Sequence, residues 1–445
     1  MTLPTHLEHR QAVADLLAPT LARVTARTES LPLAEASGRL LARDLLSPID
    51  LPPFANSQMD GYAVRSAEVA DAAPDAPLTL RVGPTTAAGD APGTLQPGFA
   101  NPVMTGAAIP AGADAVIPIE KADPPRFPSH LLQATLPPHT AGSPDDASRD
   151  AEPRDLGDVR LAPDDAVVRF AEPIASGTFV RGAGTDLAAG AVLLAAGTRL
   201  GPAQLGSIAS AGIAAVEVRP RVRVLLLSTG HELQAPGEPL TAGGIYDAST
   251  VMLGTALRDA GADVVTATAP DWAPEVIAAI GAHPDVDLVV TTGGVSAGAF
   301  EVVREALGPL GVEFGPVALQ PGGPQGLGLA ALPSGAQVPV VSFPGNPVSS
   351  LVSFELFLRP ALRAFAGMPA KRPVRRARLA HDLTSVPARH QVRRGILRPD
   401  GTVEVGHPSS HLLHAYALAD ALVHVPVGVG SLAAGSEVEV WLIDE

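Results

Sequence analysis

The stretch 289–298, VVTTGGVSAG, decides how the rest of this sequence is interpreted. A run of apolar and β-branched residues ends in the pair Gly293 and Gly294, and Gly298 and the segment AFEVVREAL follow. This pattern predicts a buried strand that turns through glycines into a helix. Glycines let backbone N–H groups of such a turn approach a ligand closely, so the stretch predicts a binding site as well as a strand end.

Strand and helix patterns alternate throughout residues 221–368. The segments RVRVLLLST, ADVVTATA, VDLVVTTGG and PVVSFPG have the composition of buried strands. The segments ASTVMLGTALRDAG, APEVIAAIGAH, SAGAFEVVREALG and SSLVSFELFLRPALRAFAG have helical patterns. This alternation predicts a parallel sheet covered by helices on both faces, with ligands beyond the carboxyl ends of its strands.

Three of these strand ends carry polar, glycine-rich turns, at 228–233, 291–298 and 342–350. Backbone N–H groups at such turns and at the helix starts behind them suit a phosphate or another oxyanion. Taken alone, each serine in them is better explained as a helix N-cap, and it is the three turns at one sheet edge together that favour an anion site. The candidate ligand-binding residues are Gly230, Gly293, Gly294, Ser296, Gly298, Pro344, Gly345, Asn346, Pro347 and Ser349.

Carboxylates lie in or near the same turns: Glu232, Asp271 and Glu301. Carboxylates beside an anion site are unfavourable unless a cation bridges them, and Mg²⁺ prefers a few carboxylates together with substrate phosphates. We therefore expect Mg²⁺ to bind there. The alternative is that these residues cap helices or form turns, as we expect for Asp247.

Composition narrows the class of protein. A chain of 445 residues with 46% apolar residues predicts two to four globular domains, and the absence of cysteine excludes disulfides and thiolate sites. No segment has the pattern of a signal peptide or a membrane span, so we expect a cytoplasmic protein. A net charge of −15 argues against nucleic acid as a partner. The basic segment 371–398 either lines an anion site or is a solvated surface.

The remaining segments have β patterns and one long loop. Short strands separated by Gly and Pro are expected from about 76 to 135 and again after Met368, and residues 137–165 have the composition of a surface loop. The segments SPIDLPPFANSQMDGYAV, MTGAAIPAGADAVIPIE, STGHEL, IYDAST, TTGGVSAG and SFPGNPVSS follow one another in this order. Together they resemble molybdopterin molybdenumtransferases of the MoeA type, which are similar to the gephyrin E domain.

The resemblance runs from about Leu7 to Glu445 and implies a multidomain α/β plus β fold. Its parts would be a discontinuous N-terminal linking domain (1–50 and 172–220), an inserted β domain (51–171), a molybdopterin-binding α/β domain (221–368) and a C-terminal β-barrel-like domain (369–445). The implied activity is insertion of molybdate into adenylylated molybdopterin, with Mg²⁺ and release of AMP. The family also implies a homodimer with each site built from both chains, and contacts with other cofactor-biosynthesis or acceptor proteins.

The matching positions imply a set of site residues. The catalytic positions would be Asp60, Thr105, Asp186, Glu232, Asp271, Glu301 and Arg394, with Ser410 near the substrate. Of these, Glu232, Asp271 and Glu301 would hold the metal.

Several positions depart from the family pattern. His231 stands where many relatives have Asp, and Gln320 and Gly323 replace two lysines that face the anionic substrate. Losing two cations removes electrostatic stabilisation, unless the basic segment 371–398 folds over the site. A catalytically weakened binding or scaffold protein is therefore the alternative. An unrelated nucleotide-phosphate enzyme would fit the glycine turns but not the order of the other motifs.

Overall fold

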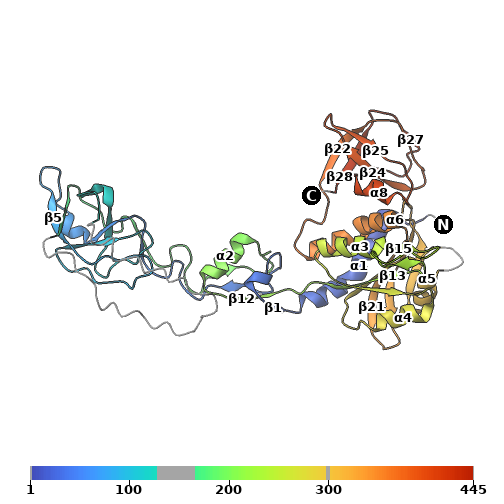
Figure 1. Cartoon of the computed structure of the whole chain (residues 1–445), viewed down its shortest axis with the longest axis horizontal. Helices are drawn as coiled ribbons and strands as arrows, with labels where there is room; N and C mark the ends of the chain where they lie inside the picture. Colours follow the sequence, from blue (N-terminus) through green and yellow to red (C-terminus); the bar gives the residue numbers. More distant parts are fainter. Residues whose placement is uncertain (1–2, 128–165, 297–300, 444–445) are drawn as a thin grey trace. The chain divides into compact units, whose positions relative to one another are not determined.

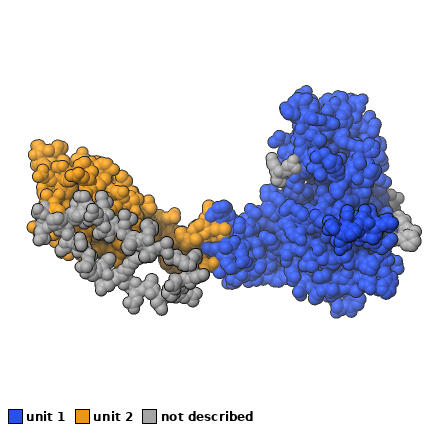
Figure 2. Space-filling view, viewed as in Figure 1, with its two compact units in different colours: residues 1–43, 196–202, 215–445 blue, residues 44–195, 203–214 orange. Residues whose placement is uncertain are grey.

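The computed structural model describes residues 3–127, 166–296 and 301–443, and the chain divides into two compact units. Unit 1 contains residues 1–43, 196–202 and 215–445, and unit 2 contains residues 44–195 and 203–214 (Figure 2). The predicted loop 137–165 and Gly298 lie outside the described residues. None of the helices formed by the described residues combines the length and the apolar character that crossing a membrane requires.

The centre of unit 1 is a six-stranded sheet in the order β16-β13-β17-β21-β20-β18 (Figure 1). The first four strands are parallel, as predicted, whereas β20 and β18 are antiparallel to their neighbours. The sheet is therefore mixed, because a short turn joins β20 to β21 and leaves no room for a crossover helix. The bounds are β13 Arg223–Thr229, β16 Asp263–Ala269, β17 Leu288–Thr292, β18 Val312–Pro316, β20 Pro324–Ala331 and β21 Gln337–Phe343.

Helices cover both faces of this sheet, as the sequence predicts. Along β13, Val224 and Leu226 face one hydrophobic core and Leu225 and Leu227 face another. The first core includes α1, α3 and the helical segment after β21, and the second includes α4 and α5. The helices are α1 His6–Thr25, α3 Ala248–Asp259, α4 Ala273–Gly281, α5 Val302–Leu307, α6 Pro347–Ser353, a π-helical turn Phe354–Leu358 and α7 Arg359–Phe365.

The C-terminal part of unit 1 is a small β barrel. Its strands follow the order β19-β24-β25-β22-β28-β26, and an additional pairing between β24 and β26 closes the ring. This closure confirms the predicted barrel-like C-terminal region. The elements are β19 Leu319–Gln320, β22 Val374–Leu379, β24 His390–Leu397, β25 Thr402–Val405, β26 Ala421–Val425, β28 Glu437–Leu442, the short pair β23 Leu383–Thr384 and β27 Ser431–Leu432, and α8 Leu413–Ala417.

Unit 1 also contains the ribbon of β1 (Glu29–Pro32) and β12 (Ala215–Val218), which pair antiparallel. Unit 2 is built on a second six-stranded sheet in the order β7-β4-β6-β5-β9-β8, which confirms the β pattern of this region. Its elements are β2 Leu45–Leu46, β3 Asn56–Ser57, β4 Gly61–Val64, β5 Leu78–Val82, β6 Phe99–Val103, β7 Ala115–Pro118, β8 Ala122–Asp123, β9 Val167–Phe170, β10 Val180–Arg181, β11 Val192–Leu194 and most of α2 Pro202–Ser210.

Candidate functional site

The three glycine-rich turns line one cavity of about 610 Å³ in unit 1. They follow β13, β17 and β21, which are adjacent parallel strands, so their carboxyl ends meet at one edge of the sheet. The predicted residues that line the cavity are Gly230, Glu232, Asp271, Gly293, Gly294, Ser296, Glu301, Pro344, Gly345, Asn346, Pro347 and Ser349. The structure therefore brings together the turns that the sequence singles out.

Gly293 and Gly345 explain why these turns need glycine. Gly293 has a φ of 97°, and a Cβ built on it would lie 3.0 Å from the carbonyl oxygen of Thr229. A Cβ on Gly345 would lie 3.1 Å from the Cα of Gly293. The three turns pack backbone against backbone, so side chains at these positions would separate them. Close packing of the turns keeps their backbone groups at the cavity.

A buried hydroxyl at the cavity has no partner among the described residues. Thr229, the last residue of β13, lines the cavity and is 7% exposed, and its Oγ1 makes no hydrogen bond within the described chain. A buried hydroxyl without a partner is unfavourable in the free protein, so a ligand that bonds to it would relieve that penalty. Thr229 directly precedes Gly230 in the chain, but its residue type alone does not mark it as a site residue.

Two of the polar residues at the cavity act as helix caps. Asp247 Oδ1 accepts a hydrogen bond from the Thr250 backbone N–H at 2.9 Å, which confirms the expected cap of α3. Asn346 Oδ1 accepts from the Val348 N–H at 3.3 Å and begins α6. Both residues also line the cavity, so capping fixes the position of its walls.

His231, Glu232 and Asp271 form a cluster at the edge of the cavity. His231 Nδ1 lies 2.9 Å from Asp271 Oδ2 and 3.9 Å from Glu232 Oε2. One potential ligand atom from each side chain lies within 4.8 Å of the others, which fits a single divalent cation. The hydrogen bond that the imidazole donates to the Asp271 carboxylate, and then the negative charge of that carboxylate, raise the pKa of His231.

Glu301 is the third acidic residue of the predicted metal set, and it bonds differently. It lines the same cavity, but its Oε2 accepts a hydrogen bond from the Ser296 backbone N–H at 2.7 Å. In the structure Glu301 thus holds the turn after β17, while His231 completes the cluster with Glu232 and Asp271.

The segment with the two missing lysines reaches the cavity only at Pro324, and neither Gln320 nor Gly323 lines it. Gln320 Oε1 accepts a hydrogen bond from Gln391 Nε2 at 2.5 Å, and Gly323 directly precedes Pro324, which lines the cavity. No residue of the basic segment 371–398 lines this cavity. Arg372, for example, pairs with buried Glu355 instead.

Arg394 and Ser410 do not line the cavity either. Arg394 is a buried residue of β24 whose guanidinium donates to the carbonyl oxygens of His407 and Ser409 at 2.8 and 2.7 Å. Its Nε and a second terminal nitrogen have no partner among the described residues, and burial lowers the pKa of the group. Ser410 follows in the turn before α8.

The remaining predicted residues belong to unit 2. Asp60 Oδ1 accepts hydrogen bonds from the backbone N–H and the hydroxyl of Thr105 at 2.6 and 2.9 Å, so these two residues form one exposed pair. Asp186 is exposed, and its backbone N–H donates to the carbonyl oxygen of Leu51 at 2.9 Å. The predicted catalytic set is thus divided between the two compact units.

Comparison with known proteins covers almost the whole chain. The region described as "MoeA N-terminal region (domain I and II)" matches residues 6–212, "Probable molybdopterin binding domain" matches 225–364, and "MoeA C-terminal region (domain IV)" matches 376–443. Molybdopterin molybdenumtransferase 2 of Mycobacterium tuberculosis is 41% identical, over 98% of each chain. Molybdopterin molybdenumtransferase of Haemophilus influenzae is 32% identical, over 93% of each chain.

The chain is also similar in structure to solved proteins of this kind. The chain aligns with the molybdopterin biosynthesis MoeA protein from Pyrococcus horikoshii with a TM-score of 0.72 and 30% identity, covering 96% of this chain and 98% of the other. This neighbour supports the multidomain fold described above.

Proposed function

Since the chain belongs to the MoeA-type molybdopterin molybdenumtransferase family, we propose that it inserts molybdate into adenylylated molybdopterin, with Mg²⁺ bound and with release of AMP. The observation that carries this proposal is the single cavity at the ends of β13, β17 and β21. Its glycine-rich turns offer backbone donors to phosphate and molybdate, and Thr229 offers a buried hydroxyl.

The cluster of His231, Glu232 and Asp271 fits the cation in this proposal. Two carboxylates at the rim of a phosphate site suit Mg²⁺, which usually completes its coordination with substrate phosphates. When bound, the cation supplies charge that offsets the negative phosphate oxygens of the departing AMP. Glu301 positions the turn after β17 through Ser296 and thereby supports the phosphate cradle.

The predicted residues of unit 2 do not line the cavity of their own chain, so their proposed role depends on dimer formation. We propose a homodimer in which Asp60, Thr105 and Asp186 of one chain complete the cavity of the other. Asp60 and Thr105 are exposed and already bonded to each other, so they present a fixed polar surface to a partner. Arg394 and Ser410 are proposed to act on the oxyanion, and the two unpaired nitrogens of Arg394 support this role.

The direct test is to mix the purified protein with adenylylated molybdopterin, Mg²⁺ and molybdate and to follow AMP release. Asp271→Asn should release AMP far more slowly than the natural protein. Glu275→Gln is the matched control, because Glu275 is an exposed carboxylate on α4 that does not line the cavity. Absence of AMP release by a folded protein that binds the substrate would reject the enzymatic proposal.

The same assay separates the alternative of a binding or scaffold protein. That alternative depends on Gln320 and Gly323, which stand where the family pattern has two lysines. It predicts tight substrate binding with negligible AMP release. The full-length relatives are named as transferases, which favours the enzyme.

A further inference from the structure

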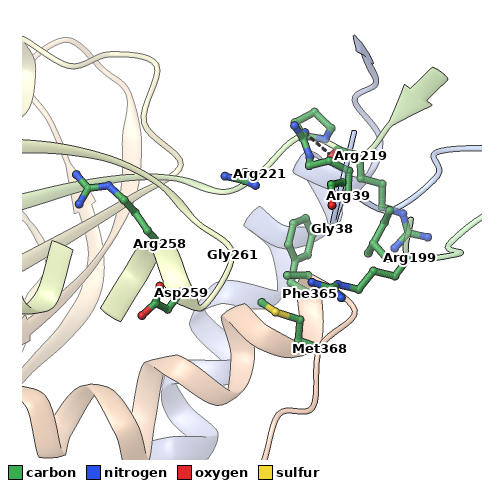
Figure 3. A pocket seen from close by; sticks show the side chains of 14 residues that line it. Gly38, Arg39, Arg199, Arg219, Arg221, Arg258, Asp259, Gly261, Phe365 and Met368 are labelled. Atoms are coloured by element: carbon green, nitrogen blue, oxygen red, sulfur yellow. Dashed lines mark hydrogen bonds between the residues drawn. The ribbon is translucent and has the colours of Figure 1, made fainter. Parts of the chain in front are cut away.

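A second cavity of about 280 Å³ lies in unit 1 and shares no lining residue with the first (Figure 3). It forms where the loop around Gly38 and the segment after β12 meet the ends of α3 and α7. Five of its lining residues are arginines, and one is acidic, Asp259, which directly follows Arg258. The arginines are Arg39, Arg199, Arg219, Arg221 and Arg258.

Four of these guanidinium groups have no partner within the described chain. Arg39 is buried and pairs with Glu29 at 2.5 Å, but the others make no side-chain hydrogen bond or ion pair with a described residue. Arg199 also acts on a neighbouring arginine: the pKa of Arg363 is lowered first by burial, then by repulsion from Arg372 and, more weakly, from Arg199. Clustered like charges repel one another, so an anion bound between them would stabilise this region.

This concentration of positive charge is unexpected in the chain as a whole. The sequence has 31 basic and 46 acidic residues. A local cluster of one sign, set in a concave surface, focuses the electrostatic potential on that surface. Guanidinium groups present several N–H donors in a fixed plane and match phosphate oxygens in pairs. The charge and its chemistry thus favour a phosphate group.

The walls of the cavity are fixed, and one of them is apolar. Gly261 has a φ of 92°, and a Cβ built on it would lie 2.5 Å from the Cβ of Ala366 and 3.1 Å from the Cε of Met368. Phe365 and Met368 lie together on the side of Arg199 and Arg219 (Figure 3). A ligand held there by its phosphate would place an apolar or planar group against Phe365 and Met368.

We propose that this cavity is a binding site for a small organic phosphate, of the size of a nucleoside monophosphate. Arg199, Arg219 and Arg221 hold the phosphate, and Phe365 and Met368 contact the ring. The cavity has room for one small ligand, which favours this class over nucleic acid or an acidic protein segment. The site is independent of the proposed catalytic function, since the two cavities have no residue in common.

The test is protection of individual arginines from phenylglyoxal, mapped by mass spectrometry on the full chain. AMP and inorganic phosphate are the two probes. AMP should protect Arg199 and Arg219 at a concentration at least tenfold lower than phosphate requires, and added salt should weaken both effects. No protection by AMP would overturn the proposal, and equal protection by both probes would overturn the ring contact.

Calorimetry with AMP provides a second measurement. AMP is expected to bind both cavities, and the double variant Arg199→Gln/Arg219→Gln should weaken one binding event at least tenfold while AMP release in the enzymatic assay continues. The matched control is Arg375→Gln/Arg376→Gln, which removes the same charge from exposed arginines of β22. Equal loss in both double variants would show a general charge effect and reject the site. Failure of the proposed enzyme activity would leave this result unchanged.

Discussion

Acid should destabilise unit 1 through a pair of buried histidines that join α1 to the C-terminal barrel. His390 Nε2 and His424 Nδ1 lie 3.0 Å apart, and the two residues are 7% and 6% exposed. His6 stacks on His390 with ring centroids 3.9 Å apart, and Trp441 lies against His424 at 4.1 Å. His424 Nε2 is buried without a partner among the described residues, so a proton there would have no acceptor.

The magnitude follows from the pKa values of the two imidazoles. Burial first, and then repulsion from neighbouring histidines, lower the pKa of His390 to about 4 and that of His424 to about 3. Well above pH 6.5 both imidazoles are neutral in the folded chain and in the unfolded chain. As the pH falls below this value, the unfolded chain takes up protons that the folded chain does not, and stability is lost. At about pH 5 the loss is about 2 kcal/mol for each histidine, or about 4 kcal/mol for the pair.

Urea unfolding measured by tryptophan fluorescence can test this. The chain has 2 tryptophans, and Trp272→Phe leaves Trp441, beside His424, as the single reporter. The matched variant is His390→Gln/His424→Asn, because Gln and Asn place an amide where Nε2 and Nδ1 form the present contact, and neither amide titrates. Both proteins are compared at about pH 7.5 and about pH 5.

Between these pH values the free energy of unfolding should fall by about 4 kcal/mol more in the protein with both histidines than in the His390→Gln/His424→Asn variant. The contribution of the carboxylates to the loss of stability is the same in both proteins, so it cancels in the comparison. Equal losses in the two proteins would refute the reasoning, because the histidines would then not be the source of acid sensitivity.

The other predictions concern the first cavity. Asp271→Asn should weaken Mn²⁺ binding by about tenfold or more, because it removes a charged ligand. Electron paramagnetic resonance measures the affinity for Mn²⁺, and an unchanged affinity would show that Asp271 does not bind the metal. Gly323→Lys should tighten molybdate binding by about tenfold, since a hydrogen bond to a charged group contributes about 1.5 kcal/mol. A Cβ at this position would make only ordinary contacts, at 3.5 Å and 3.6 Å, so we expect the variant to fold. Calorimetry can then measure its affinity for molybdate. Mixing the inactive variants Glu232→Gln and Asp60→Asn should restore roughly a quarter of the natural activity, because about half of the random dimers would be mixed and each mixed dimer would have one intact site of its two. No recovery would show that both residues act in a site within one chain.

Much of the α/β fold could be predicted because its signals are local. The apolar runs before Thr229 and Thr292 are strands, and Asp247 caps the next helix as expected. The helical pattern after β21 contains a π-helical turn, which the apolar periodicity of this segment does not predict. Pro360 lies at the start of α7 and cannot donate the usual helical hydrogen bond, so a wider turn before it is physically reasonable.

The candidate site was predictable where strand order determines it. Asp271 follows β16, and β16 pairs with β13, so Asp271 lies beside the turn that contains His231 and Glu232. The arginines of the second cavity come from four separate parts of the chain, at 39, 199, 219–221 and 258, so only the folded chain shows that they line one cavity. Local patterns contain no information about such convergence.

The division of unit 1 along the sequence has a consequence for biosynthesis. Helix α1 ends at Thr25, and its Val13 and Leu17 pack in the core that includes Val224 of β13. About 200 residues separate the two elements, so at 5–20 residues per second the ribosome needs roughly 10–40 s to produce the partner of α1. During this interval the apolar face of α1 is available to chaperones, whereas all strands of the unit 2 sheet have been synthesised once the chain reaches Phe170.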